Sequence, residues 1–307
     1  MNALFPVAAE VPDRIISAPI LPDILLPRKG RGRVVSFVVR HPAIAMGGGL
    51  LFALVLMAIL APYLGTLDPT AVAPAQRTRV PSALNWFGTD PLGRDLYSRV
   101  LYGARVSLTV GFCVAISASV IGLAIGLVTG FVPWIDNILM RVMDGMMSIP
   151  PILVAIALMA LTRGSVTNVI IAITLAEIPR VSRLVRSIVL TLREQPFVDG
   201  AVVAGTRTPM IVLRHILPNT LAPMTVQATY IFASAMIVEA ILSFIGAGTP
   251  SHIPSWGNIM SDGRALWQVK PHIVFFPAVF LSITVLAVNL LGDGLRDAVD
   301  PRMAKRM

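Results

Sequence analysis

Charge is scarce in this chain. Of its 307 residues only 13% are Asp, Glu, Lys or Arg, whereas 55% are hydrophobic, which excludes an ordinary soluble domain. Three runs, 41–67, 106–135 and 271–292, contain no charged residue. Each is long enough to cross about 30 Å of hydrocarbon as a helix. The composition therefore predicts an all-α, polytopic membrane protein.

Cysteine is nearly absent, because Cys113 is the only one and it lies within an apolar run. A single thiol cannot form an intramolecular disulfide or a cysteine cage for a metal, so a packing role is expected. The four histidines, at positions 41, 215, 252 and 272, lack the spacing of metal ligands. We therefore expect neither a metal site nor a cofactor.

Catalytic motifs are also missing. The chain contains no G-x-x-x-x-G-K-[ST] phosphate loop, no H-E-x-x-H and no G-x-S-x-G. It cannot bind ATP through a phosphate loop, and no catalytic residue is predicted. The net charge of +9 would suggest nucleic acid in a soluble chain, but here the basic residues flank apolar runs. Positive-inside topology explains most of them, so no nucleic-acid partner is expected.

The apolar runs divide the chain into six predicted spans with both termini in the cytoplasm. This orientation places seventeen of the 25 Lys and Arg residues inside. The chain is predicted to begin with a Pro-rich basic tail at 1–40, which rests on anionic membrane lipid, followed by a first transmembrane helix at 41–65. An external segment is predicted at 66–104, a five-helix core at 105–293 and a cytoplasmic tail at 294–307.

The external segment is predicted to hold an amphipathic helix on the membrane surface. Asp90 followed by Pro91 is typical of a helix start, with Asp as the N-cap. The residues after it form an apolar face and a basic face, the latter made by Arg94, Arg99 and Arg105. Such a helix serves either as a structural elbow into the second span or as a direct contact for a solute.

Small residues and prolines predict how the spans pack. Gly122, Gly126 and Gly130 recur at four-residue intervals, which lets another helix approach closely. Pro150 and Pro151 interrupt the third helix and are expected to kink it. The bend is interpreted as a packing feature, with a gating role as the alternative.

Charged residues predict two ion pairs near the inner ends of the spans. Arg141 and Asp144 are three residues apart on the third helix, which is expected to follow an inside turn at 133–137. Glu177 and Arg180 have the same spacing on the fourth, whose lower half is predicted to project into the cytoplasm. Glu177 alternatively faces a water-filled path.

The most unusual stretch is the inside loop 195–219, which is polar and basic within a very apolar chain. Its first half has helical spacing, with one stripe formed by Val198, Ala201, Val202 and Gly205. Small residues keep this short helix slim, so that its backbone could lie close to another protein. A loop of this length and pattern predicts that something docks on it.

These residues resemble a known family, the permeases of ABC importers. Residues 195–219 are similar to the family's EAA loop, with Asp-Gly-Ala at 199–201 where Glu-Ala-Ala is usual. The stretches 87–108, 239–248, 254–264 and 289–302 look like those of the C-type permease of dipeptide, oligopeptide and nickel importers. Their order also matches, and only the first 40 residues lie outside the resemblance.

The resemblance implies a type I ABC importer permease fold and a non-catalytic subunit in a bacterial inner membrane. It further implies a second, homologous permease, two cytoplasmic ATPase subunits and an external solute-binding protein as partners. It implies a coupling helix seated in a groove of an ATPase, formed by Asp199, Gly200, Ala201 and Gly205. The exit of this helix would be fixed at the start of the next span by Leu217 and Pro218.

Two other functions are weighed against a permease. A stand-alone carrier or channel would need an internal inverted repeat or a charged pore ring, and neither is apparent in the sequence. A membrane scaffold without transport would not respond to partner ATPases. The sequence does not name a solute, because the binding protein of such importers does most of the selecting.

Overall fold

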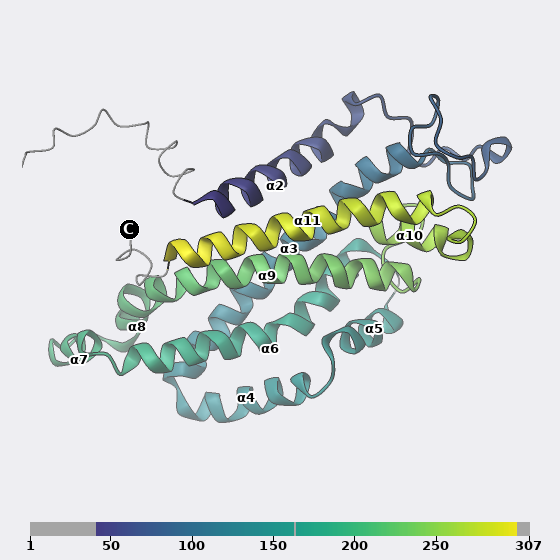
Figure 1. Ribbon diagram of the computed structural model, residues 1–307. Coiled ribbons are helices and arrows are strands. Elements are labelled where there is room, and N and C mark those ends of the chain that lie inside the picture. The colour runs from purple at the N-terminus through teal and green to yellow at the C-terminus, as the bar shows by residue number, and fades with distance from the viewer. Residues whose placement is uncertain (1–40, 163, 300–307) are drawn as a thin grey trace, which may run out of the picture. The chain divides into compact units, whose positions relative to one another are not determined.

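The computed structural model describes residues 41–162 and 164–299, and the predicted tail 1–40 lies outside them. Every regular element in these ranges is helical, which confirms the all-α prediction. The helices, labelled as in Figure 1, are α2 (Pro42–Leu60), α3 (Leu96–Phe131), α4 (Pro133–Met147), α5 (Pro151–Leu161), α6 (Val166–Arg193), α7 (Pro196–Val203), α8 (Thr208–Ile211), α9 (Leu217–Phe244), α10 (Trp256–Gly263) and α11 (His272–Val299).

Short helical turns also occur within the described ranges. Three are 3₁₀ turns, and a π-helical turn joins α8 to α9. They are Ala61–Tyr63, Pro74–Gln76, Arg264–Leu266 and the π-helical Val212–Ile216.

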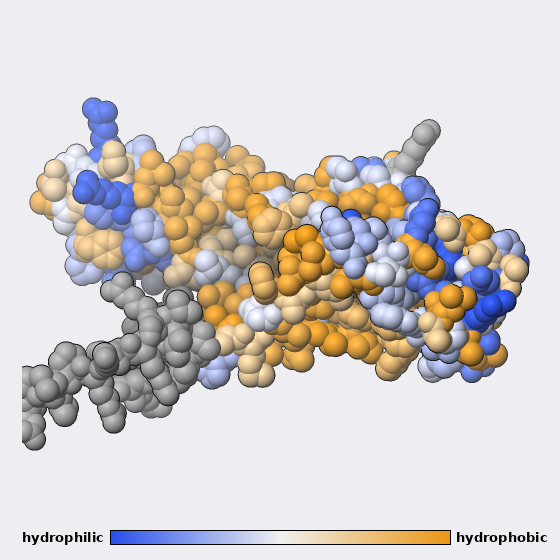
Figure 2. Space-filling model, turned by 90° about the horizontal axis from the view of Figure 1, so that it is seen from above, coloured by the Kyte–Doolittle hydropathy of each residue, from blue (hydrophilic) through white to orange (hydrophobic). Residues whose placement is uncertain are grey.

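Four helical segments within the described ranges are long and apolar enough to cross a membrane. They are Pro42–Tyr63, Leu96–Phe131, Thr208–Phe244 and His272–Ala298, and α4 with α5 would make a fifth as one bent span. Figure 2 shows hydrophobic residues over the middle of the molecule and hydrophilic residues at both ends. The predicted fourth span falls on α6, which has 28 residues but is not among these candidates because its second half is charged.

The start of α3 differs from the prediction. Asp95, not Asp90, is the N-cap, and its carboxylate accepts a bond from the backbone N of Ser98 at 2.8 Å. No separate surface helix forms, because α3 runs unbroken from Leu96 into the second span. Arg99 is only 1% exposed rather than part of a solvated basic face. The predicted N-cap was wrong because Asp90 has buried arginine partners.

The predicted bend between α4 and α5 is larger than a kink. The two helices meet at an angle of 89° at Pro150 and Pro151. Because proline has no backbone N–H, the helical hydrogen bonds cannot continue through this point. The turn predicted at 133–137 is instead helical, because α4 begins at Pro133 directly after α3. Asp144 pairs with Arg183 of α6 rather than with Arg141.

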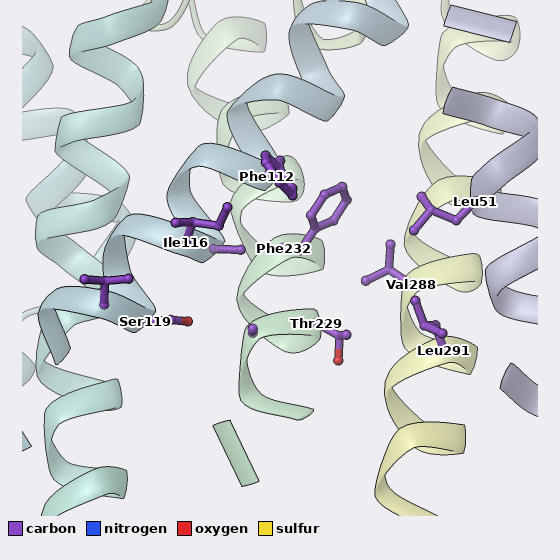
Figure 3. A pocket seen from close by; sticks show the side chains of 11 residues that line it. Leu51, Phe112, Ile116, Ser119, Thr229, Phe232, Val288 and Leu291 are labelled. Atoms are coloured by element: carbon purple, nitrogen blue, oxygen red, sulfur yellow. The ribbon is translucent and has the colours of Figure 1, made fainter. Parts of the chain in front are cut away.

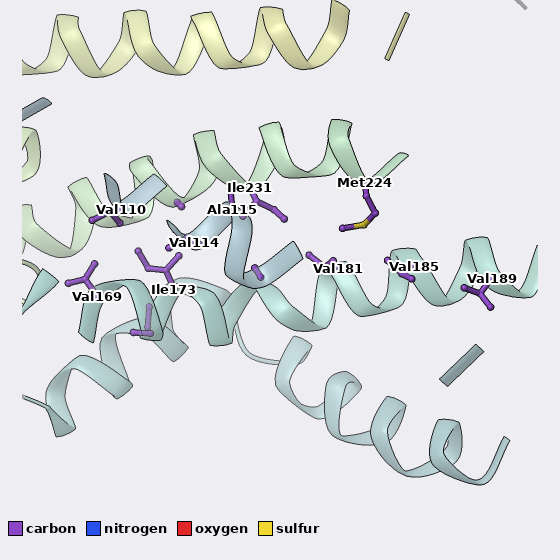
Figure 4. Packing of buried hydrophobic residues seen from close by; sticks show 14 of the residues in the cluster. Val110, Val114, Ala115, Val169, Ile173, Val181, Val185, Val189, Met224 and Ile231 are labelled. Carbon is purple, nitrogen blue, oxygen red and sulfur yellow. The ribbon is translucent and has the colours of Figure 1, made fainter. Parts of the chain in front are cut away.

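The glycine stripe of α3 packs against a valine stripe of α6, as the spacing predicted. A Cβ added at Gly122 would lie 2.5 Å from Val181 Cβ, and one at Gly126 would lie 2.5 Å from Val185 Cβ. Gly130 faces Val189 in the same way. Figure 4 shows Val181, Val185 and Val189 in a row along α6. These buried residues hold α3 and α6 together as one rigid pair.

The remaining spans pack around that pair. In Figure 1, α11, α9 and α6 lie side by side, and α2 lies along α11. A Cβ at Gly47 of α2 would meet the backbone N of Leu291 at 2.5 Å, so α2 and α11 are in close backbone contact. Since α11 runs to Val299, the helix continues beyond residue 294, where the tail was predicted to begin.

Candidate functional site: the tip formed by α7 and α8

The segment 195–219 forms a tip at one end of the molecule (Figure 1). Pro196 occupies the first turn of α7, where its missing N–H costs no hydrogen bond. Asp199 lies in the same turn, where a carboxylate interacts favourably with the positive end of the helix. The helix ends at Val203, two residues before the predicted Gly205. A short helix therefore begins and ends here for local reasons.

Gly205 stops α7 through its backbone conformation. Its φ is +76°, in the left-handed region that disfavours residues with a Cβ. Its N–H bonds to Val202 O at 2.9 Å, and the N–H of Thr206 bonds to Ala201 O at 3.0 Å. This pair of bonds is the Schellman motif, which satisfies the last carbonyls of a helix. The spacing in the sequence predicts a small residue at Gly205, and its left-handed backbone adds a conformational reason for glycine that no local pattern reveals.

Apolar anchors attach the tip to the core of the protein. Val198 is buried at 4% exposure, and it belongs with Ile211 and Ile216 to the same apolar cluster as the α6 valines. Ala201 packs against this cluster as well. The ring of Phe197 lies 6.4 Å from that of His215, between the two sides of the tip. The tip is therefore packed firmly against the ends of α6 and α9 that flank it.

The opposite surface of the tip is apolar and exposed. Val203 is 89% exposed and Val202 58%, although both are large hydrophobic residues. Met210 and Leu213 are exposed beside them on the second half of the tip. Uncovered apolar side chains next to basic residues such as Arg207 are typical of a protein interface.

The structure separates the predicted stripe into two faces. Val198 and Ala201 point to the core, whereas Val202 and Gly205 are exposed, together with Asp199 and Gly200. A Cβ at either glycine would meet no atom within 4 Å. Space therefore surrounds the glycines of the tip.

Leu217 and Pro218 stand where the tip returns to the membrane. Leu217 is the first residue of α9 and is half-buried, and Pro218 follows it in the first turn. The side chain of Asn219 donates a bond to His215 O at 2.6 Å, which joins the π-helical turn to α9. The exit from the tip is thus a continuous helical path rather than a loose loop.

A charged cluster joins distant segments at the other end of the molecule. Asp90 is fully buried and accepts bonds from Arg94 and Arg99. Asp262 of α10 accepts a bond of 2.8 Å from each of the same two arginines. Two positive and two negative groups neutralise one another here, which makes burial of Arg99 possible. No local sequence signal could reveal this cluster, since Asp262 follows Arg99 by 163 positions.

A second polar network joins α3, α9 and α10. Glu239 of α9 is fully buried, and it accepts bonds from Ser243 at 2.8 Å and from Ser107 of α3 at 3.3 Å. The Ser107 hydroxyl in turn accepts the backbone N–H of Trp256 at 3.3 Å, and the Trp256 indole donates to Val100 O at 3.0 Å. The network holds α10 against α3 and α9 at this end of the protein.

Among the described residues, no group of three His, Cys, Asp or Glu side chains could hold a metal ion. The Asp90 cluster and the Glu239 network join helices to one another, whereas the tip leaves apolar side chains exposed beside basic ones. Spans that carry such a tip outside the apolar belt define a membrane subunit of a larger assembly.

Comparison with known proteins identifies that assembly. Residues 118–305 match the family described as the binding-protein-dependent transport system inner membrane component. The chain belongs to this family, and it is therefore the non-catalytic permease subunit of an ABC transporter. Both the resemblance seen in the sequence and the expected class of function are confirmed.

Individual relatives are similar over most of their length. A probable peptide ABC transporter permease protein, y4tQ of Sinorhizobium fredii, is 50% identical over 281 residues, which are 91% of this chain and 96% of the relative. The dipeptide transport system permease protein DppC of Alkalihalophilus pseudofirmus is 43% identical over 83% of this chain and 84% of its own. A glutathione transport system permease protein, GsiD of Salmonella typhimurium, is 40% identical over 86% and 88%.

Solved structures show the same fold. The inward-facing MetNI methionine ABC transporter contains a chain that matches with a TM-score of 0.54 at 20% identity. The match covers 67% of this chain and 98% of that one. Family membership places the protein in the inner membrane as a multi-pass component that works with ATPase and binding-protein partners.

Proposed function

We propose that the chain is half of the translocation path of a peptide importer, and that the tip 195–219 couples it to an ATPase. The proposal rests on the exposed apolar surface of α7, where Val203 is 89% exposed. Relatives named for peptide, dipeptide and glutathione transport support a peptide or a similar small solute. One ATPase would dock on this permease and a second on a homologous partner permease.

Each predicted coupling residue has a role at this tip. Asp199, Gly200 and Gly205 would face the ATPase groove, because they are exposed and the glycines leave space around them. Ala201 would connect the docked face to the core, since it packs on the cluster beneath. Leu217 and Pro218, at the start of α9, would fix the exit of the chain from the groove.

Coupling would then be mechanical. The tip continues into α6 and α9, and the α6 valines are packed tightly against the α3 glycines. A stiff connection of this kind converts displacement of α7 into rigid-body motion of the spans. Closure of the two ATPases on ATP would move the two permeases relative to each other, and so open or close the path between them.

The proposed topology has six spans. Five are the four long segments and the bent pair of α4 and α5, and the sixth is α6. The charged half of α6 would leave the hydrocarbon at the end that carries the tip. Glu177 and Arg180 pair at 3.3 Å near the middle of α6, as predicted from their spacing. Both termini and the tip would lie in the cytoplasm, and α10 with its charged cluster would face the external binding protein.

Co-purification with the partner subunits tests this function. We expect ATPase subunits to accompany the permease from detergent, and the reconstituted complex to import dipeptides only with ATP and the binding protein present. Dipeptide transport by the permease alone in liposomes would instead establish a stand-alone carrier. Absence of transport with every subunit present would favour a scaffold.

A further inference from the structure

Two surfaces of the spans differ in chemistry. A groove of about 370 Å³ between α2, α3, α9 and α11 is almost wholly apolar, and its hydroxyl groups come only from Ser119 and Thr229. Figure 3 shows this groove lined by Phe112, Ile116, Phe232, Val288 and Leu291. Such a lining suits lipid hydrocarbon: its one buried hydroxyl without a partner is Ser119 Oγ, among the described residues, and the groove carries no amide and no charge.

The other side of α9 carries polar residues. Two adjoining hollows, of about 230 and 170 Å³, lie between α9 and α11 and share Tyr230 and Asn289. Together they form what we call the α9–α11 furrow. Its other polar residues are Gln227, Ser234, Asp293 and Arg296, together with Thr229, which also borders the apolar groove. The furrow runs from the middle of α9 toward the end of α11 that lies near the tip (Figure 1).

Polar groups in the furrow are arranged to meet an external partner. The Nε2 atom of Gln227 is buried and has no hydrogen-bond partner among the described residues. Asn289 and Tyr230 are exposed on the two sides of the furrow. A buried unpaired amide in lipid would cost several kcal/mol, on the order of the cost of an unmade hydrogen bond in hydrocarbon.

A cation lies beside the furrow on α6. The guanidinium of Arg180 sits 5.4 Å from the centre of the Tyr230 ring and donates to Glu177 at 3.3 Å. Glu177 is buried and also accepts a bond from Ser234 of α9 at 3.3 Å. Arg180 is thus held half-exposed on the same surface as Tyr230, with donors left over. Hydrocarbon cannot solvate this surface, whereas water can.

We propose that the α9–α11 furrow, with Arg180 beside it, lines the water-filled path and contacts the backbone of the transported peptide. This inference rests on the proposed function for the identity of the solute. The phenol of Tyr230 and the amides of Gln227 and Asn289 offer both donors and acceptors, which suit peptide N–H and C=O groups. Arg180 suits the terminal carboxylate.

The same chemistry predicts breadth of specificity. Amide and hydroxyl groups read the peptide backbone, which all peptides share, and the furrow has no deep apolar pocket for one kind of side chain. Peptides of different side chains are therefore expected to pass through it equally well once the binding protein has delivered them.

Single-cysteine labelling tests the furrow directly, because Cys113 is the only cysteine in the chain. In the Cys113→Ala background, Asn289→Cys and Ser234→Cys place a thiol in the furrow. Val120→Cys provides the matched control, since Val120 lines the apolar groove on α3 and is exposed. The assembled transporter, in vesicles with its ATPases and binding protein, is treated with a charged methanethiosulfonate that does not cross membranes.

Only a thiol in contact with water ionises and reacts with such a reagent. We expect Asn289→Cys to react at least roughly tenfold faster than Val120→Cys, a ratio that corresponds to one unit of thiol pKa. Transported dipeptide with its binding protein should slow the furrow reaction and leave the control unchanged. Ser234→Cys gives the same reading if Asn289→Cys fails to assemble with the ATPases.

Other outcomes overturn the inference. Equal, slow reaction at both positions means that the furrow faces lipid. Fast reaction in the isolated permease that disappears in the assembled complex, without dipeptide, means that the second permease covers the furrow. Dipeptide uptake by the Cys113→Ala complex is measured separately, so failure of peptide transport is distinguished from failure of the furrow assignment.

Discussion

Substitution of Gly205 separates two physical reasons for a glycine at the end of α7. The residue has a φ of +76°, which costs an ordinary L-residue about 1–2 kcal/mol. A Cβ there would meet no atom of this chain within 4 Å, so no packing term is added. We expect Gly205→Ala to destabilise the end of α7 by about 1 kcal/mol, and to leave the spans folded.

Asparagine provides the matched comparison, because it tolerates the left-handed conformation better than alanine but is larger. If the ATPase approaches the backbone closely, ATPase recovery should fall in the order Gly205, Gly205→Ala, Gly205→Asn, with Gly205→Asp lowest. If only the backbone angle matters, Gly205→Asn should exceed Gly205→Ala. The assay measures ATPase co-purification and dipeptide uptake at equal permease in the membrane. Wild-type co-purification together with wild-type uptake in Gly205→Asp would refute a coupling role for this position.

Two stability predictions follow from packing and charge. Gly126→Ala should lower the free energy of unfolding by about 1–3 kcal/mol, because its Cβ would overlap Val185. Gly145→Ala is its control: Gly145 has open space in α4, so that change should raise helix stability by about 0.5–1 kcal/mol. Asp262→Asn should cost about 1–3 kcal/mol, because it removes a charged acceptor from buried Arg99. Thermal unfolding of the purified complex measures each, and equal midpoints for the two glycine variants would contradict the packing account.

Local patterns predicted much of the fold. The apolar runs located the spans, and four-residue spacing in Gly122, Gly126 and Gly130 predicted a helix contact that the structure contains. The spacing of Glu177 and Arg180 predicted their pair. These predictions succeeded because hydrophobicity, helical periodicity and short-range charge contacts depend on residues within a few turns of one another.

Local patterns failed where a residue had a choice of partners. Asp90 before Pro91 has the form of a helix start, yet Asp90 binds buried arginines and Asp95 caps the helix. Asp144 lies three residues after Arg141, yet it pairs with Arg183 on a neighbouring helix. Asp144 pairs with a residue that the fold brings near from 39 positions away, whereas Asp90 is surrounded by arginines four and nine positions on, which the turn before α3 places around it.

The tip 195–219 shows the same division within one site. Its sequence alone predicted a short, slim helix between two spans, because proline, glycine and apolar spacing act locally. Only the tertiary structure decided that Val198 points to the core while Val203 is left exposed. The face that a helix buries depends on which other helices pack against it, here the flanking ends of α6 and α9. That packing leaves the other face of the short helix uncovered, and it is this face that we propose as the ATPase contact.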